Sequence, residues 1–459
     1  MKKTVSFGII TALLCCMLAG CSKPETASAV PEEAFATQAV EVGAAPAAET
    51  TAAETTAAET TAVEKVTEAP EVGPVPATVP EKTASLLSAK VERYFGCAQG
   101  SDNRMLYEIT YPHVLAEGSD ALQASLDKEF EREKAAAATN KNDFTETMKE
   151  RKDADFYCQS TNETVVARAD SSVFSVLSLT TWYGGGAHGE LVRTALNYRT
   201  SDGKFLTAAD VFTDTAELKR ILKERLTAAY PDAGFFGLDE AFESYEPEAT
   251  PADTEKIRYN FLLTSDGAEF LFNSYELAPY ASGQQFVELA FEDYPYLFNQ
   301  EVMVSAPSYF MPVIFDEVQK VAGHVVKVSL NQGEAAIRGI VVDEDGSTCE
   351  FETFAGTANG YYVVKEGRLY LYIFEGREDD ENIIQIFDLN GAKPEKAGEF
   401  EGSLAKEYKQ LTAEAPDTAA SMTVFEQLTD PDNFVLEKGL KQGKKTAFGI
   451  SENGMPAEK

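Results

Sequence analysis

The segment 22–80 most constrains how this chain can fold, because its composition cannot build a packed core. The segment is dominated by Ala, Thr, Glu, Val and Pro, contains one aromatic residue, Phe35, and repeats the pentad Glu-Thr-Thr-Ala-Ala from residue 49 onward. Such sequences bury too little apolar surface to offset the entropy lost on ordering. We therefore expect residues 21–80 to form a disordered tether and the folded part to begin after residue 80.

The first 20 residues have the organisation of a lipoprotein signal peptide. Lys2 and Lys3 precede an uncharged, mostly apolar run that ends at Met17, as in secretory signals. Leu18-Ala19-Gly20-Cys21 then resembles a bacterial lipobox, in which the cysteine receives a diacylglycerol and becomes the new N-terminus. The apolar run is shorter than the roughly 20 residues that span a bilayer. We expect Cys21 to be lipidated and palmitate-labelled, and to hold the chain on the extracytoplasmic face of the cell membrane; an ordinary secretory signal or a short anchor is the alternative.

The charge of the chain disfavours some partners and favours others. Its 459 residues include 75 acidic and 40 basic side chains, which gives a formal net charge of -35. A field of this sign repels phosphate backbones, so we expect no nucleic-acid partner, whereas basic partners are favoured. Acidity alone also serves solubility, so it does not by itself identify a ligand.

Between residues 81 and 300 the sequence predicts an α+β fold, an antiparallel sheet with two helices. Apolar residues recur at four-residue spacing in 119–134, and again in 218–230 after Asp214 and Glu217, which have the spacing of a capping box. Alternating segments bounded by turn residues predict the strands: 91–95, 105–111, 156–158, 164–169, 173–183, 194–200, 259–264, 269–272 and 286–291. We expect this module to consist of two halves, 81–190 and 191–300.

After residue 300 the pattern changes to short strands without long helices. The expected strands are 324–330, 335–342, 348–354, 361–364, 369–374 and 383–388. Turns rich in Gly, Asn and Asp separate them, as in a meander or sandwich. We therefore predict a separate all-β accessory domain at 301–440, followed by a loosely ordered, Lys- and Gly-rich tail at 441–459.

The sequence offers little support for catalysis, metals or cofactors. The three histidines, His113, His188 and His324, include no close pair, which disfavours zinc hydrolases with clustered histidines. Residues 184–189 satisfy G-x-G-x-x-G, but the βαβ setting of a dinucleotide site is missing. After loss of the signal and lipidation of Cys21, the remaining cysteines allow at most one intramolecular disulfide and match no zinc spacing: Cys97, Cys158 and Cys349. We expect no enzyme, metal or cofactor, although a wall hydrolase with paired carboxylates stays open as an alternative.

An ordered series of motifs in residues 85–300 resembles a known pair of domains. The motifs are Tyr111-Pro112, the run from Trp182 to His188, Thr200 to Phe205 with Phe212, and the run from Tyr275 to Gly283. The series is similar to the paired extracytoplasmic domains of unknown function in a lysozyme-binding anti-sigma factor of Gram-positive bacteria and ahead of certain polysaccharide deacetylases. The resemblance implies a Gram-positive bacterium and binding of a basic protein such as lysozyme. This chain has neither the sigma-binding segment nor the deacetylase domain, so those two activities are not expected.

Two of these motifs supply the candidate site. Aromatic residues present amphipathic surfaces that anchor protein partners or stack on sugars, and the candidate ligand-binding residues are Trp182, Tyr183, His188 and Tyr280. Glycine permits positive φ and close backbone approach, and proline favours loops; the residues that shape the motifs are Gly184, Gly185, Gly186, Pro279 and Gly283. The alternative is that the glycines merely form a bulge and the aromatic residues pack inward. A cell-wall glycan is the second candidate ligand.

Overall fold

The computed structural model describes residues 78–100, 105–117, 119–150, 156–185, 188–332, 337–342, 346–353, 358–376, 381–411, 419–440 and 443–459. The expected signal peptide, Cys21 and nearly all of the expected tether lie outside these residues, so they stay predictions. From residue 78 onward, the described chain belongs to one compact unit. It is a mixed α+β structure with few helices, as the sequence predicts.

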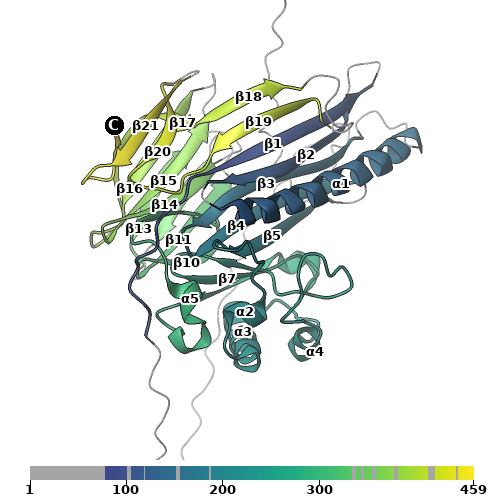
Figure 1. The fold of residues 1–459 in the computed structure, drawn as a ribbon, viewed down its shortest axis with the longest axis horizontal. Helices are drawn as coiled ribbons and strands as arrows, with labels where there is room; N and C mark the ends of the chain where they lie inside the picture. Colours follow the sequence, from purple (N-terminus) through teal and green to yellow (C-terminus); the bar gives the residue numbers. More distant parts are fainter. Residues whose placement is uncertain are drawn as a thin grey trace, which may run out of the picture. The chain divides into compact units, whose positions relative to one another are not determined.

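A seven-stranded sheet forms the centre of the N-terminal half (Figure 1). Its strands, in spatial order, are β18 (Lys406–Gln410), β19 (Ser421–Glu426), β1 (Ala89–Gln99), β2 (Met105–Ala116), β3 (Cys158–Ala169), β4 (Val173–Tyr183) and β5 (Glu190–Arg199). The expected hairpin of 91–95 with 105–111 is confirmed as β1 and β2, paired antiparallel. By contrast, β2 and β3 are parallel, because a helix connects them and returns the chain to the same end of the sheet.

That helix, α1 (Asp120–Glu150), is about twice as long as the sequence predicts. It covers one face of the seven-stranded sheet through four buried residues: Leu122, Leu126, Ala137 and Phe144. The expected end at residue 134 is wrong because the next turn consists of Ala135 to Ala138, which favours a helix by intrinsic propensity although it lacks the four-residue apolar spacing.

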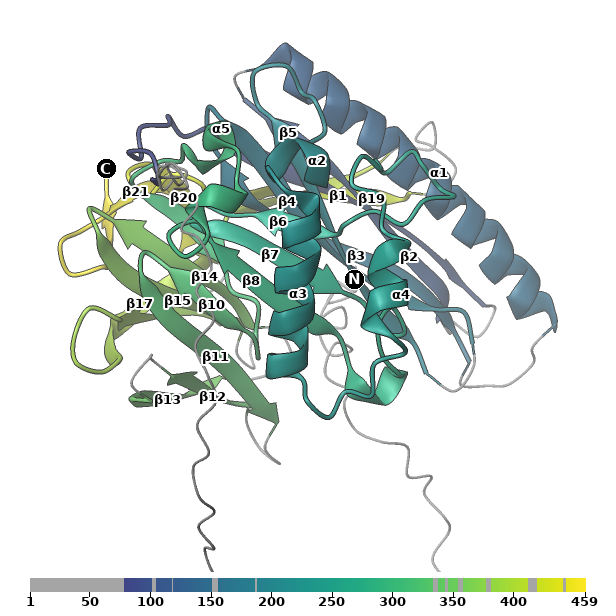
Figure 2. The same ribbon diagram turned by 90° about the horizontal axis from the view of Figure 1, so that it is seen from below.

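A smaller sheet lies on the opposite face of the seven-stranded sheet. Its strands are β6 (Phe261–Leu263), β7 (Gly267–Phe272) and β8 (Gln285–Ala290). On one side, Leu262, Leu271 and Phe286 pack against Leu177 and Ala195 of the larger sheet. The other side packs against the helices of this region (Figure 2): α2 (Ala208–Val211), α3 (Thr215–Ala229) and α4 (Leu238–Glu243).

The second predicted helix is confirmed as α3. Asp214 caps it, and its side chain accepts hydrogen bonds from the N–H groups of Ala216 and Glu217. The buried residues repeat at helical spacing and face the three-stranded sheet: Leu218, Ile221, Leu222 and Leu226. A short helix, α5 (Gln300–Met303), then ends the helical part of the described chain.

The all-β character expected after residue 300 is confirmed in the described residues that follow α5. An eight-stranded sheet has the order β22 (Pro456–Glu458), β21 (Lys444–Ile450), β20 (Phe434–Lys438), β17 (Glu395–Leu404), β16 (Asn382–Asp388), β15 (Arg368–Gly376), β14 (Ala358–Lys365) and β9 (Tyr309–Pro312). A four-stranded sheet contains β10 (Val318–Val321), β11 (His324–Gln332), β12 (Ile337–Val342) and β13 (Thr348–Thr353). One apolar core joins the two sheets through residues such as Val328, Tyr362 and Leu371.

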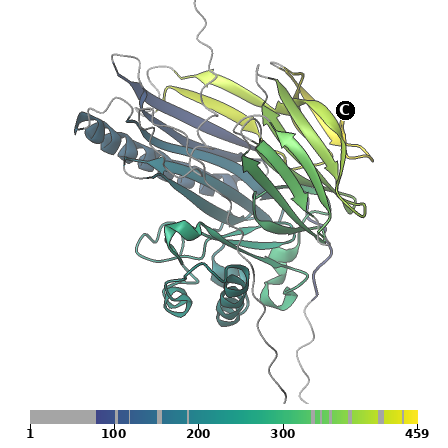
Figure 3. The same cartoon turned by 180° about the vertical axis from the view of Figure 1, so that it is seen from behind.

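This β-rich region differs from the expected independent domain at 301–440. Its strands β18 and β19 extend the N-terminal sheet (Figure 3). β19 pairs with β1, and Met422 lies opposite Tyr94 in this pairing. Without β19, β1 would present an unpaired edge, which folded proteins normally cover. The boundary at residue 300 therefore does not separate two compact units.

The expected loosely ordered tail at 441–459 is also wrong for its described part. Residues 444–450 form β21, which pairs with β20 and β22. Phe448 is buried and contacts the rings of Phe400 and Phe434. Lysine and glycine suggested disorder, but the buried residues Phe448 and Ile450 alternate with partly exposed positions and supply an apolar strand face.

Candidate functional site

The Gly-rich motif forms the connection between β4 and β5. Trp182, near the end of β4, lies opposite Glu190, the first residue of β5. Gly185 has φ 95°, a conformation that favours glycine. A Cβ atom on Gly184 would lie 2.5 Å from Cη2 of Trp182, so a side chain at this position would have to displace the indole that covers it. The predicted residue Gly186 lies outside the described residues.

Trp182 and Tyr183 lie on opposite faces of the sheet, so they cannot both share one surface with the other two candidate residues. Consecutive strand residues point to opposite faces of a sheet. The Trp182 ring is 40% exposed and lies 6.3 Å from the ring of Phe144 on α1. The Tyr183 ring is half-buried and lies 6.1 Å from that of Phe156. The inward-packing alternative therefore fits Tyr183 better than Trp182.

His188 and Tyr280 meet in space, and Tyr275 joins them. The rings of His188 and Tyr280 stack with centroids 4.1 Å apart and planes 21° apart. The Tyr275 ring lies 5.4 Å from that of Tyr280 and 6.5 Å from that of His188. Tyr280 donates a hydrogen bond from its hydroxyl to the carbonyl oxygen of Gly189, at 3.3 Å. We call His188, Tyr275 and Tyr280 the exposed aromatic group, because His188 and Tyr275 are exposed and Tyr280 is partly so.

Local backbone geometry presents this group. Tyr275 is 56% exposed and has φ 68°, which is unfavourable for a residue other than glycine. Pro279 precedes a single 3₁₀ turn over Tyr280–Ser282, and Gly283 follows it at φ 68°, which shows why these two motif residues flank Tyr280. Tyr275 is part of the sequence motif, but its exposure depends on its φ angle, so sequence reasoning did not select it.

A second loop lies beside the motif. Phe236 donates a backbone hydrogen bond to the carbonyl oxygen of Leu277, at 3.0 Å. Ser282 donates from its hydroxyl to the carbonyl oxygen of Ala233, at 2.7 Å. The Phe236 side chain is 64% exposed. Two hydrogen-bonded loops, 231–237 and 273–283, thus present aromatic side chains to solvent.

Partly buried polar groups hold the 273–283 loop against the domain. Glu276 accepts a hydrogen bond from the hydroxyl of Tyr245, and its other oxygen accepts from the N–H of Asn273 at 2.7 Å. Burial raises the pKa of Glu276. Asn273 in turn accepts from the N–H of Arg193 on β5, at 2.8 Å. The exposed aromatic group therefore sits on a fixed platform rather than on a free loop.

The surroundings of these loops are acidic. Residues 209–292 contain 17 acidic and 6 basic side chains. Four of the acidic residues near the two loops are exposed: Glu190, Asp232, Asp239 and Glu240. The field of this surface therefore attracts cationic groups.

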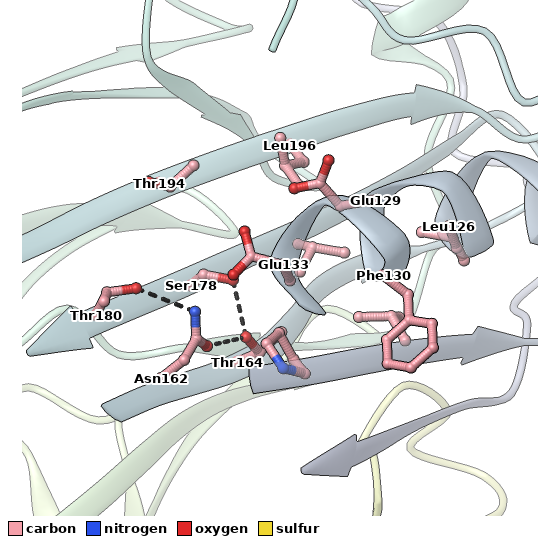
Figure 4. A pocket seen from close by; sticks show the side chains of 13 residues that line it. Leu126, Glu129, Phe130, Glu133, Asn162, Thr164, Ser178, Thr180, Thr194 and Leu196 are labelled. Atoms are coloured by element: carbon pink, nitrogen blue, oxygen red, sulfur yellow. Dashed lines mark hydrogen bonds between the residues drawn. The ribbon is translucent and has the colours of Figure 1, made fainter. Parts of the chain in front are cut away.

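A separate cavity lies between α1 and the seven-stranded sheet (Figure 4). Its volume is about 40 Å³, on a scale where one water needs about 10–15 Å³. The sheet supplies a chain of hydrogen bonds, in which Asn162 donates to Thr180 at 3.0 Å and accepts from Thr164 at 2.6 Å. This cavity has room for only a few water molecules and is too small for a sugar ring.

Two carboxylates from α1, those of Glu129 and Glu133, line this cavity. Arg132 binds both of them, and its distance to Glu133 is 2.7 Å. Burial raises the pKa of Glu133. The pair bears on the alternative of a carboxylate-based hydrolase, because both carboxylates already bind the same guanidinium and the cavity that they line has no room for a glycan.

Other candidate chemistry is sparse in the part of the chain that the structure describes. None of its groups of three or more His, Cys, Asp and Glu side chains is placed to hold a metal ion. Cys97, Cys158 and Cys349 form no disulfide with one another. Among the described helices, we find none that combines the length and the apolar character needed to cross a bilayer.

Comparison with known proteins identifies a domain in this region. Residues 209–292 match the family described as "Protein of unknown function (DUF3298)". The crystal structure of a DUF3298 family member from Bacteroides fragilis is 18% identical, covers 49% of this chain and 98% of its own, and gives a TM-score of 0.34. One from Pseudomonas aeruginosa is 15% identical, covers 50% and 99%, and gives 0.32. No curated protein matches the chain significantly.

The matched residues lie within the second half of the expected module, 191–300, and include α3, α4, the three-stranded sheet and the loops that carry Phe236, Tyr275 and Tyr280. The expected kinship with a domain of unknown function is thereby supported, while the anti-sigma factor and deacetylase settings stay predictions. The chain contains a DUF3298 domain at residues 209–292.

Proposed function

We propose that this chain is a lipid-anchored extracytoplasmic binding protein, without enzymatic activity, that holds a basic protein such as lysozyme. One observation carries the proposal: Phe236, Tyr275 and Tyr280 stand on hydrogen-bonded loops of a DUF3298 domain with 17 acidic and 6 basic residues. His188, from the connection between β4 and β5, stacks on Tyr280 and completes the exposed aromatic group. Aromatic side chains dominate many interfaces because they bury much surface at low entropic cost. Acidic neighbours steer a cationic partner to them.

The anchoring part of the proposal rests on the sequence alone. Leu18-Ala19-Gly20-Cys21 provides the lipidation site, and the acidic tether of 21–80 spaces the folded part from the membrane. We expect radiolabelled palmitate to be incorporated into the full chain in a Gram-positive host and to be lost in Cys21→Ser. Recovery of the unlabelled wild-type chain from the cytosol would contradict the anchor.

Retention on immobilised hen lysozyme tests the ligand. We expect the full chain to be retained at low salt and released as salt rises toward about 0.5 M, where the screening length falls to a few ångströms. Tyr275→Ala should reduce retention at least about tenfold, which is the effect of one interface anchor. Tyr408→Ala is the matched control, because Tyr408 is 58% exposed on β18 and lies outside the DUF3298 domain.

Two results would reject this ligand. The first is an absence of retention at low salt, and the second is an equal loss of retention in Tyr275→Ala and Tyr408→Ala. The first result would leave the lipid anchor unaffected, because palmitate labelling measures it separately.

A cell-wall glycan is the second candidate ligand, and the stacked geometry of the aromatic group favours it. Sugar rings pack on aromatic faces, and such contacts depend little on salt. Tyr275, at 56% exposed, is more open to solvent than Tyr280, which is partly buried. Sedimentation with purified peptidoglycan separates the two ligands, because glycan binding should persist at about 0.5 M salt while protein binding driven by charge should fall.

A further inference from the structure

The three-stranded sheet of the DUF3298 domain carries two acidic residues on the face that turns away from α3. Glu269 on β7 and Glu288 on β8 lie directly opposite one another in the antiparallel register. Their neighbours Phe270 and Val287 belong to the core under α3, so the two glutamates point to the other side by strand alternation. Glu269 is 1% exposed.

Both carboxyl groups meet the strand β10. One oxygen of Glu269 accepts a hydrogen bond from the side-chain amide of Gln319, at 2.8 Å. One oxygen of Glu288 accepts from the backbone N–H of Lys320, at 2.6 Å. Among the described residues, the second oxygen of each carboxyl group has no hydrogen-bond partner, and neither has the buried hydroxyl of Tyr362. We call Glu269, Glu288 and their β10 partners the acidic seam.

The charges around the acidic seam do not neutralise two carboxylates. From β5, Arg193 approaches Glu317 at 3.9 Å. The ammonium group of Lys320 binds two other acids, one of them Asp293 at 2.9 Å. Asp266, in the turn before β7, adds further negative charge.

Two carboxylates on directly opposed positions of neighbouring strands repel strongly when both are buried and ionised. A shared proton removes this repulsion, and it turns one carboxyl oxygen into a donor for the other. We propose that Glu269 and Glu288 share an exchangeable proton, which fastens the DUF3298 domain to β10 and makes this contact pH-sensitive. Loss of the proton leaves two charges in the seam and loosens it.

The direction of the pH effect follows from the folded and unfolded states. Burial raises the pKa of Glu269 to about 8, and burial together with Glu269 raises the pKa of Glu288. An unfolded glutamate has a pKa of about 4.3. Between these values the folded chain holds a proton that the unfolded chain has released. Stability is therefore greatest below the unfolded value and declines as pH rises through about 8.

The contact matters for the fold because β10 is the first strand of the four-stranded sheet. Gln319 also accepts a hydrogen bond from the N–H of Ile314, at 2.8 Å. Its amide therefore couples the DUF3298 domain to the segment that enters the β-rich region. The acidic seam controls how firmly these two parts of the same compact unit are joined.

Thermal unfolding of the full chain tests this proposal. We expect the midpoint of the wild type to fall by about 4 °C or more between about pH 6 and about pH 9. Glu269→Gln should reduce that fall by half or more, because an amide donates to Glu288 without titrating. Glu288→Gln provides a second variant of the same design. Glu301→Gln is the control, since the Glu301 side chain is 85% exposed, and its pH profile should follow that of the wild type.

A second titrating group contributes to the wild-type profile and cancels in the comparison. Burial opposes protonation of His113, but its hydrogen bonds with Glu92 and Asp127 outweigh burial and raise its pKa. Deprotonation of His113 therefore also lowers the stability of the folded chain as pH rises. The difference between the midpoint profiles of each variant and the wild type therefore reports only the contribution of the acidic seam. Profiles of both Gln variants that match the wild type would overturn the proposal.

Discussion

The DUF3298 domain uses aromatic residues in two opposite ways. In its core they are almost fully buried, for example Phe242 and Phe270, which are 1% and 0% exposed. In the neighbouring loops, Phe236 and Tyr275 are 64% and 56% exposed. The core rings lie between α3 and the sheet, where any compact fold would place them. The exposed rings lack such a structural reason, which makes them informative about function.

The exposed group also has an energetic cost that the core rings do not have. Tyr275 adopts φ 68°, and a non-glycine residue in this region costs on the order of 1 kcal/mol. Partly buried hydrogen bonds of Glu276 hold the adjacent backbone in place. A local cost that is retained at an exposed position is typical of a binding surface.

Phe270→Ala should have the largest effect and tests the core side of the comparison. Phe270 is fully buried and contacts the rings of Phe212 and Phe261, each at 5.6 Å. We expect the free energy of unfolding to fall by about 3–5 kcal/mol, because a large cavity forms. Chemical denaturation measures this loss. A loss below about 1 kcal/mol would mean that the buried aromatic rings contribute little to the stability of the domain.

Gly184→Ala should have the next largest effect. It tests Trp182, whose exposure of 40% lies between that of the buried core rings and that of the exposed loop rings. The new methyl group would meet the indole at 2.5 Å and displace it from Phe144. We expect a loss of about 1–3 kcal/mol, as for other overpacked positions. The chain has one tryptophan, so its fluorescence reports this movement directly. An unchanged emission spectrum would show that the indole does not cover Gly184.

Tyr245→Phe tests the link between the buried aromatic rings of the core and the exposed aromatic rings of the loops. Tyr245 belongs to the buried core, and its hydroxyl donates to Glu276, next to Tyr275. Removing the hydroxyl leaves a buried carboxyl oxygen without its donor, which should cost about 1–2 kcal/mol. We expect the same variant to weaken ligand retention, because the loop loses a support. Unchanged retention together with reduced stability would show that Tyr245 serves the core alone.

The sequence predicts those parts of the fold whose signal is local. The cap Asp214 and the apolar spacing after it predict α3, and the turn after residue 99 predicts the pairing of β1 with β2. The pairing of β1 with β19 joins residues more than 300 positions apart. No local spacing encodes such a contact, so the sequence favours two domains where the structure has one compact unit.

In the candidate site, too, the sequence predicts the features that have a local signal and misses those that depend on contacts between distant segments. The motifs of the sequence contain His188 and Tyr280, and the structure stacks their rings. The exposure of Phe236 and Tyr275 depends on a positive φ angle and on hydrogen bonds between two loops, and neither leaves a mark in composition or periodicity. The acidic seam could not be predicted from the sequence either. The chain has 75 acidic residues, and its sequence does not indicate that Glu269 and Glu288 lie opposite each other in the folded sheet.

Tyr275→Ala should have the smallest effect on stability and is the sharpest test of the comparison. Its side chain is mostly in solvent, and alanine meets the same backbone strain at φ 68°. We therefore expect the free energy of unfolding to change by no more than about 0.5 kcal/mol, while ligand retention falls. Denaturation and retention measured on one preparation separate the two quantities. A loss of stability comparable with that of Phe270→Ala would place Tyr275 among the structural rings, since a side chain retained for binding should leave the folded state unaffected when it is removed.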